Sequence, residues 1–209
     1  MHEELKEQLR QIAVNYNGKA FWAIINRVKK DRISDDELLK QIETTSLRRF
    51  MEKVRLKFSV LIGNLMEFMV MIAAIILAFQ VGSDLMLYVS ALLLMTTLHP
   101  LSHYLAGSFL GIRFTHYYLN GPAKIEPTLR IDYSSYLKIS GKKRAVMHAS
   151  GVIGTVLSPL IPVMIALNKG ASGAAMNLFI LFLVLIVFEL LTSTRIGDLM
   201  RARREYRYG

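Results

Sequence analysis

The sequence predicts an all-α integral membrane protein with four transmembrane helices and a small helical region ahead of them. Of its 209 residues, 53% are hydrophobic, and the mean hydropathy is +0.34. The apolar residues are gathered into long blocks and do not form amphipathic stripes. Only helices or closed barrels satisfy their backbone polar groups in lipid, and these blocks do not alternate with a period of two. The spans are therefore expected to be helices.

Residues 1–58 are expected to form amphipathic helices on the cytoplasmic side. The first ten residues, MHEELKEQLR, are too charged for a secretory signal. The stretch Ser34-Asp35-Asp36-Glu37 fits a capping box at the start of a helix. Apolar residues keep helical spacing in three runs, which are Leu5, Leu9 and Ile12, then Phe21, Ile24, Ile25 and Val28, then Leu38, Leu39 and Ile42. A small helical domain or a set of membrane-surface helices explains this pattern.

The membrane domain is expected to cover residues 59–200 and to be followed by a basic tail, 201–209. A bilayer core of about 30 Å needs about 20 apolar residues in a helix. Four blocks meet this length, at 59–81, 85–112, 145–167 and 174–196. The loop 113–144 differs, because it holds aromatic and β-branched residues, the turn signal Asn120-Gly121-Pro122 and Pro127. That composition predicts a hairpin or an extended segment near the membrane surface.

The distribution of basic residues predicts the topology. The formal net charge is +10, and of the 26 Lys and Arg residues 13 precede residue 59, 7 lie in 113–144 and 5 follow from Arg195 onward. Under the positive-inside rule both termini and the middle loop are cytoplasmic, and the short turns near 82–84 and 169–173 lie outside. The positive charge thus reflects topology and attraction to anionic lipid headgroups, not a nucleic-acid partner.

Two histidines lie within the second apolar block, in the stretch HPLSH at 99–103. His99 and His103 are four residues apart, so they share one helix face and both rings can reach one tetrahedral ion. Histidine is costly within a bilayer and tends to face the protein interior with a partner. The chain has no cysteine, so a metal site here must use histidine and carboxylate ligands. Zinc fits this pair, and hydrogen-bonded core histidines are the alternative.

Two residues are candidates for a third ligand. Asp198 follows the fourth block at its cytoplasmic end, and His148 lies at the cytoplasmic start of the third. In the expected topology both lie on the same side of the membrane as the histidine pair. The alternative for Asp198 is an ordinary surface carboxylate neutralised by Arg195 or Arg201.

This layout resembles the site-2 protease family, zinc metalloproteases that cleave peptide bonds within the membrane. The resemblance covers roughly residues 85–200 and implies a three-helix core. His99 and His103 match the family's His-Glu-x-x-His motif, and Asp198 in Gly197-Asp198-Leu199 matches the aspartate of its Leu-Asp-Gly motif. ASGVIGT at 149–155 is similar to the small-residue stretch of the intervening helix, with Val152 and Thr155 in place of its proline and asparagine. The resemblance implies zinc as cofactor and transmembrane substrate or partner helices.

Pro100 departs from the family motif. The family has glutamate at this position, and that side chain takes a proton from the zinc-bound water and returns it to the leaving amine. Proline can do neither, and loss of a general base typically costs a factor of about 100 to 10,000 in rate. Proline also removes the backbone donor that would bond to Thr96, so we expect the helix to bend there.

These observations support one main hypothesis and two alternatives. The main hypothesis is a metal-binding, site-2-protease-like membrane protein whose proteolytic activity is lost or altered, acting as a binding or regulatory protein for membrane substrates. The first alternative is an active intramembrane zinc metalloprotease with another base. The second is a small proton-coupled transporter. For both, the candidate acidic residues are Glu67 and Glu189, which lie deep in the first and fourth blocks.

Overall fold

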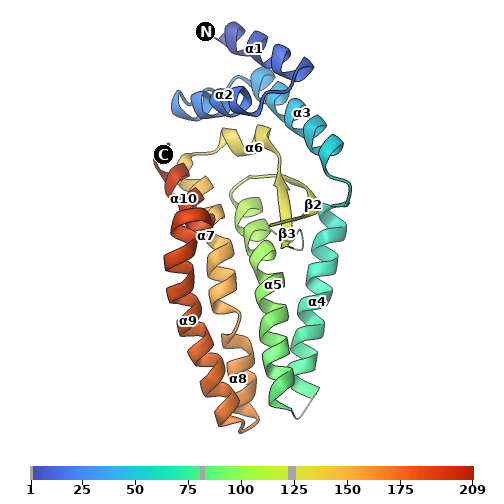
Figure 1. Ribbon diagram of the computed structural model, residues 1–209, viewed down its shortest axis with the longest axis vertical. Coiled ribbons are helices and arrows are strands. Elements are labelled where there is room, and N and C mark those ends of the chain that lie inside the picture. Colours follow the sequence, from blue (N-terminus) through green and yellow to red (C-terminus); the bar gives the residue numbers. More distant parts are fainter. Residues whose placement is uncertain (1, 81–82, 122–125) are drawn as a thin grey trace.

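The computed structural model describes residues 2–80, 83–121 and 126–209. Four helical segments are long and apolar enough to cross a membrane, which makes this a membrane protein by length and composition. They are α4 (Val60–Gln80), α5 (Asp84–Phe109), α7 with α8 (Gly141–Leu157 and Leu160–Asn168) and α9 (Ser172–Ile196). They run side by side as a bundle, and both chain termini lie at the same end of it (Figure 1).

The third span differs from the uninterrupted helix expected at 145–167. It begins earlier, at Gly141, because the Ser140 side chain caps the helix by accepting from the backbone N–H of Lys143. It is also divided between α7 and α8 at Ser158 and Pro159. Proline has no backbone N–H to continue the helical ladder, and the Ser158 hydroxyl donates to the Thr155 carbonyl over 2.7 Å. The break lies within the expected span.

The region before the first span forms three helices, α1 (His2–Val14), α2 (Gly18–Lys30) and α3 (Asp36–Lys53), stacked on one end of the bundle (Figure 1). Their apolar faces share one buried core with residues of the membrane domain, including Phe114 and Tyr136. The third helix starts one residue later than the expected capping box, because Asp35, not Ser34, accepts from the Leu38 N–H over 2.9 Å.

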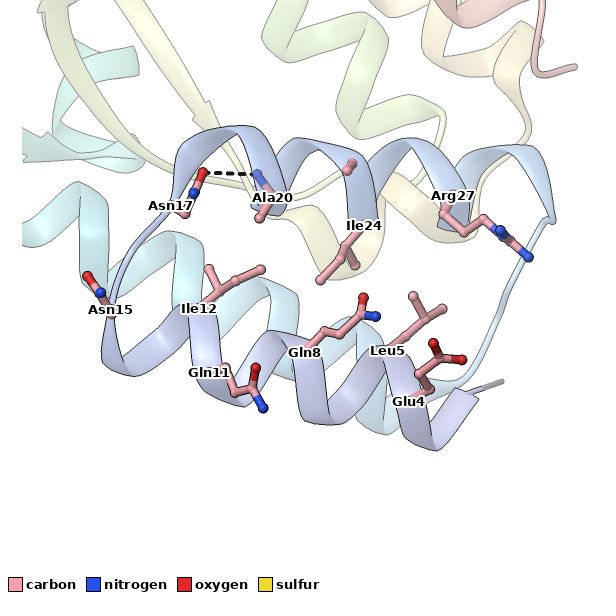
Figure 2. Close-up of a pocket in the computed structure, with 11 residues that line it drawn as sticks. Glu4, Leu5, Gln8, Gln11, Ile12, Asn15, Asn17, Ala20, Ile24 and Arg27 are labelled. Atoms are coloured by element: carbon pink, nitrogen blue, oxygen red, sulfur yellow. Dashed lines mark hydrogen bonds between the residues drawn. The ribbon is translucent and has the colours of Figure 1, made fainter.

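An open groove of about 650 Å³ lies between α1 and α2 (Figure 2). Leu5, Ile12 and Ile24 lie along it, and Asn17 caps α2 by accepting from the backbone N–H of Ala20 over 3.2 Å. All of the described residues that line the groove lie between Glu4 and Arg27, ahead of the membrane domain.

A small antiparallel sheet lies where the N-terminal helices meet the bundle. Its strands are β1 (Lys57–Ser59), β2 (Phe114–Asn120) and β3 (Glu126–Ile131), in the order β1-β2-β3. The last two form the hairpin that the loop composition predicts, although Pro122 of the turn signal and the end of the first predicted span, residue 81, lie outside the described residues. The rest of the described chain is mostly helical, as predicted. The first strand was not predicted: the segment leading into α4 pairs with β2.

The sheet is tied to both parts of the molecule. The Tyr117 ring packs over Gly63 of α4, where an added Cβ would lie 2.1 Å from it, and its hydroxyl donates to Asn64 over 2.9 Å. On the other side, Arg130 pairs with Glu43 of α3 at 2.7 Å. The hairpin is therefore held between the N-terminal helices and the first two spans.

Two short helices complete the chain. Helix α6 (Tyr133–Lys138) follows the hairpin, and its N-cap Asp132 accepts from the Ser135 N–H over 3.0 Å. Helix α10 (Asp198–Tyr206) follows the fourth span after a sharp change of direction at Gly197. This change of direction places the first residue of α10 beside α5.

Candidate metal centre

Three potential metal ligands from two separate parts of the chain meet beside α5. The Nε2 atoms of His99 and His103 lie 3.3 Å and 3.1 Å from one carboxylate oxygen, Oδ2 of Asp198. One ligand atom from each residue lies within 4.8 Å of the other two. The side chains are only 23%, 14% and 12% exposed, respectively. The structure therefore brings together the three residues that the sequence analysis selected.

Helix α5 presents both histidines on one face. They are one turn apart, and their ring centroids are 4.8 Å apart. The helix is not interrupted at Pro100, which is buried within it. Hydroxyl groups of the preceding turn, those of Thr96 and Thr97, both donate to the Leu93 carbonyl. The proline thus lies inside a continuous helix between the two rings.

The other ring nitrogen of each histidine is hydrogen-bonded to α7. His103 Nδ1 lies 2.7 Å from the Met147 carbonyl oxygen, which can only accept, so this nitrogen carries the proton. His99 Nδ1 lies 2.9 Å from Thr155 Oγ1, and that hydroxyl donates to the Gly151 carbonyl over 3.2 Å. The hydroxyl proton is committed, so His99 Nδ1 is the donor. In the neutral rings both Nε2 atoms therefore carry a lone pair toward Asp198.

Two glycines let α7 approach α5 closely enough for these bonds. A Cβ added to Gly151 would lie 2.2 Å from His103 Nε2, and one added to Gly154 would lie 2.6 Å from the Leu98 carbonyl oxygen. Both distances are shorter than any real Cβ contact, so neither position accommodates a side chain without a shift. The small-residue stretch at 149–155 therefore has the packing role expected of it.

Asp198 is positioned by the joint between α9 and α10. The Ser193 side chain, one turn before the end of α9, accepts from the backbone N–H of Leu199 over 3.1 Å. The second carboxylate oxygen of Asp198 receives Arg201 Nη1 at 3.2 Å. Burial opposes ionisation of this carboxyl group. When His103 and His99 are protonated, their hydrogen bonds and positive charges outweigh burial and lower the pKa of Asp198 below its ordinary value.

The three side chains open onto a cavity of about 340 Å³. Its wall includes Pro100 and residues of β3, from Glu126 to Leu129 and Ile131. Since β3 pairs only with β2 among the described strands, its other edge is unpaired. The triad and β3 thus line the same cavity.

His148, the alternative third ligand, is not part of the group of three. Its Nε2 is hydrogen-bonded to the Tyr136 hydroxyl at 2.9 Å, and its ring centroid lies 6.5 Å from that of His103. The imidazole is buried between α6 and α7. His148 therefore lies beside the three candidate ligands without joining them.

The two membrane acids proposed as alternative bases lie in different places. Glu189 on α9 is close enough to interact electrostatically with His99 and Asp198, but it does not line the cavity. Glu67 on α4 lies near Tyr117, on the other side of the hairpin. Neither is among the described residues that line the cavity of the triad.

Sequence reasoning missed three features of the site. Thr155 was noted only as a departure from the family pattern, yet it orients His99. The Met147 carbonyl does the same for His103, and no side-chain pattern marks a backbone acceptor. Glu126 enters the cavity wall only because the hairpin folds back against α5. The position of Thr155, one turn after Gly151, is the only signal that was available.

Comparison with known proteins adds no assignment: no family model, no curated protein and no solved structure matches this chain.

Proposed function

We propose that this protein is a zinc-binding, site-2-protease-like membrane protein whose proteolytic activity is lost or altered. The observation that carries the proposal is the orientation of the two imidazoles. Both Nδ1 atoms donate to α7, so two Nε2 lone pairs and a carboxylate oxygen point at one another. Three acceptors in a partly buried site repel one another unless a cation or two added protons lie between them.

Zinc fits this donor set in kind, and both nitrogen–oxygen separations fit a tetrahedral ion. Ligands at about 2.0–2.1 Å from a tetrahedral ion lie about 3.3 Å from each other. The two nitrogen–oxygen separations, 3.1 Å and 3.3 Å, match the edge of such a tetrahedron. Two histidines and one carboxylate with an open fourth position are typical of catalytic zinc centres, whereas structural ones are closed. Zinc, when bound, polarises carbonyl groups and activates water.

The chemistry at this centre lacks the family's base. Pro100 stands where the family's glutamate would face the substrate, and it lines the cavity without any group that can accept a proton. Binding of a polypeptide does not need that base. Strand β3 lines the same cavity and has one edge without a partner among the described strands. Such an edge is suited to an extended peptide, because main-chain hydrogen bonds can add a strand to it. We therefore favour recognition of a membrane polypeptide at the metal centre.

The metal content of the purified protein tests this proposal. We expect about one zinc per chain in the wild type and loss of that zinc in His99→Ala and in Asp198→Ala. His2→Ala and Asp84→Ala are matched controls, because they remove the same side chains far from α7 and should retain the metal. Wild-type protein that stays metal-free in the presence of excess zinc would refute the proposal.

A second candidate, an active intramembrane metalloprotease, is favoured by one further observation. Glu126 at the start of β3 lines the cavity of the triad and interacts electrostatically with His99. A carboxylate in this place can act as the general base that Pro100 cannot provide.

Cleavage of a transmembrane peptide in reconstituted protein separates the two candidates. The active-enzyme candidate requires cleavage that is abolished by His103→Ala and reduced about 100-fold or more by Glu126→Gln, with zinc content unchanged in the latter. Glu67→Gln is the control that should cleave at the wild-type rate. If the wild-type protein binds zinc but does not cleave the peptide, the binding function stands and the active-enzyme candidate is rejected.

A further inference from the structure

A buried ion cluster joins the N-terminal helices to the helix that carries Asp198. Glu205 of α10 is fully buried, and it accepts from Lys29 Nζ of α2 and, over 2.8 Å, from Arg144 Nε of α7. The two cationic side chains are only 2% and 3% exposed. Arg144 is held further by the Ile139 carbonyl, which it contacts through Nη1 at 2.6 Å. One carboxylate thus connects three elements.

The side chains of the cluster are almost fully shielded from solvent. The Tyr136 ring lies beneath both cations, with Lys29 Nζ 5.2 Å and Arg144 Cζ 5.5 Å from its centroid. Burial lowers the pKa of Lys29, although Glu205 opposes the shift. Burial opposes ionisation of Glu205, but Lys29 and Arg144 lower its pKa. Lys29 and Glu205 therefore each favour the charged form of the other.

Asp198 and Glu205 belong to the same short helix. They are seven residues apart, which is about two turns, so both project from one face of α10. A helix of nine residues is too short to be stable by itself, and α10 follows Gly197, where the chain changes direction. Its orientation therefore depends on the elements it contacts, α7 and α9 by packing and α2 through Glu205.

We propose that Lys29 and Glu205 form a positioning contact through which the N-terminal helices hold α10, and with it the Asp198 carboxylate, against the two histidines. This assigns the N-terminal region a role in building the centre in the membrane domain. The test by zinc affinity rests on the proposed zinc function, whereas the test by amide hydrogen exchange does not.

The variant Lys29→Met removes the cation of α2 while Arg144 still pairs with Glu205. We expect the zinc affinity to fall about 10-fold or more, as for other residues that orient metal ligands. The absorption spectrum of the cobalt-substituted protein should shift toward that of Asp198→Ala, because the carboxylate is no longer held at the ion. Lys29→Arg should restore both, since it keeps a cation at this place.

Lys6→Met is the matched control. Lys6 is also a buried lysine paired with carboxylates, Asp35 and Glu37, but all its partners lie within the N-terminal helices. It should leave the zinc affinity and the cobalt spectrum unchanged. Equal effects of the two variants, or wild-type behaviour of Lys29→Met, would overturn the positioning role.

Amide hydrogen exchange of metal-free protein keeps the test independent of zinc. Lys29→Met should increase exchange within residues 198–206 relative to wild type, whereas Lys6→Met should increase it only within the N-terminal helices. Unchanged protection of residues 198–206 in Lys29→Met overturns the inference. A wild type without zinc refutes the proposed function instead.

Discussion

At the scale of single residues, hydrogen bonds to one nitrogen of each histidine decide what the other nitrogen can do. The Met147 carbonyl and the Thr155 hydroxyl accept hydrogen bonds from the two Nδ1–H groups, which leaves both Nε2 atoms for a ligand. Thr155, which stands where the family has asparagine, thus has a defined hydrogen bond to His99. Pro100, by contrast, removes a chemical group and supplies no other.

Replacement of Thr155 tests the orientation of His99. The valine side chain in Thr155→Val has nearly the same shape as threonine but cannot accept a hydrogen bond from His99 Nδ1. Zinc affinity should fall about 10- to 100-fold, because groups that orient metal ligands contribute about this much. Isothermal titration with zinc measures the change, and Thr155→Ser should recover most of it. Wild-type affinity in Thr155→Val would show that Thr155 does not orient the ring.

Replacement of Pro100 tests whether only the base is missing. Pro100→Glu restores the full His-Glu-x-x-His spacing and returns a backbone N–H to the helix. Cleavage of a transmembrane peptide should rise by about 100- to 10,000-fold, the usual contribution of a general base. Adding His103→Ala to this variant should abolish the gain. A zinc-loaded Pro100→Glu protein that does not cleave would place the defect elsewhere in the site.

At the scale of elements, the contact between α5 and α7 forms the centre. The glycines of α7 allow the approach, and the carbonyl and hydroxyl groups of α7 orient both rings on α5. Helix α10 then adds the carboxylate from a third direction. The break in the third span at Pro159 lies beyond this contact, so the part of the span that meets α5 stays a regular helix.

A methyl group added to α7 tests this contact. Gly151→Ala would place a Cβ 2.2 Å from His103 Nε2, so the ring must move by more than the tolerance of about 0.2 Å that metal–ligand distances allow. We expect loss of stoichiometric zinc in metal analysis while the protein remains folded by circular dichroism. Gly173→Ala, where no atom lies within 4 Å of the added carbon, should keep its zinc.

At the scale of the whole molecule, a metal would join the second span to the end of the fourth, and the ion cluster joins that end to the N-terminal helices. A ligand that binds only the folded state raises the free energy of unfolding, by about 2.7 kcal/mol at a concentration of 100 times Kd. The centre is therefore expected to contribute to stability as well as to chemistry.

Chelation tests this contribution. Removing zinc from detergent-solubilised protein should lower the free energy of unfolding by about 2.7 kcal/mol relative to protein in 100-fold excess zinc over Kd. Urea titration followed by tryptophan fluorescence is a suitable measurement, since Trp22 lies on α2. The same treatment of His99→Ala should change nothing. An equal effect on both proteins would indicate a site elsewhere.

The sequence by itself determined the four spans, the amphipathic N-terminal helices, the hairpin region and the shared face of His99 and His103. These features depend on composition and spacing over short stretches, and the chain carries that information locally. The capping residue of α3 lies one residue after the predicted one, and the third span begins four residues before its predicted start. Helix ends depend on single side-chain hydrogen bonds, which the sequence does not fix to the residue.

Only the tertiary structure decided that Asp198, and not His148, joins the histidines, and that Lys29 reaches Glu205 across 176 positions of the chain. The strand β1 and the place of Glu126 in the cavity wall were also settled at this level. The physical reason is that these contacts join residues far apart in the chain. Their geometry depends on which helices pack closely, and here two glycines of α7 determine that packing.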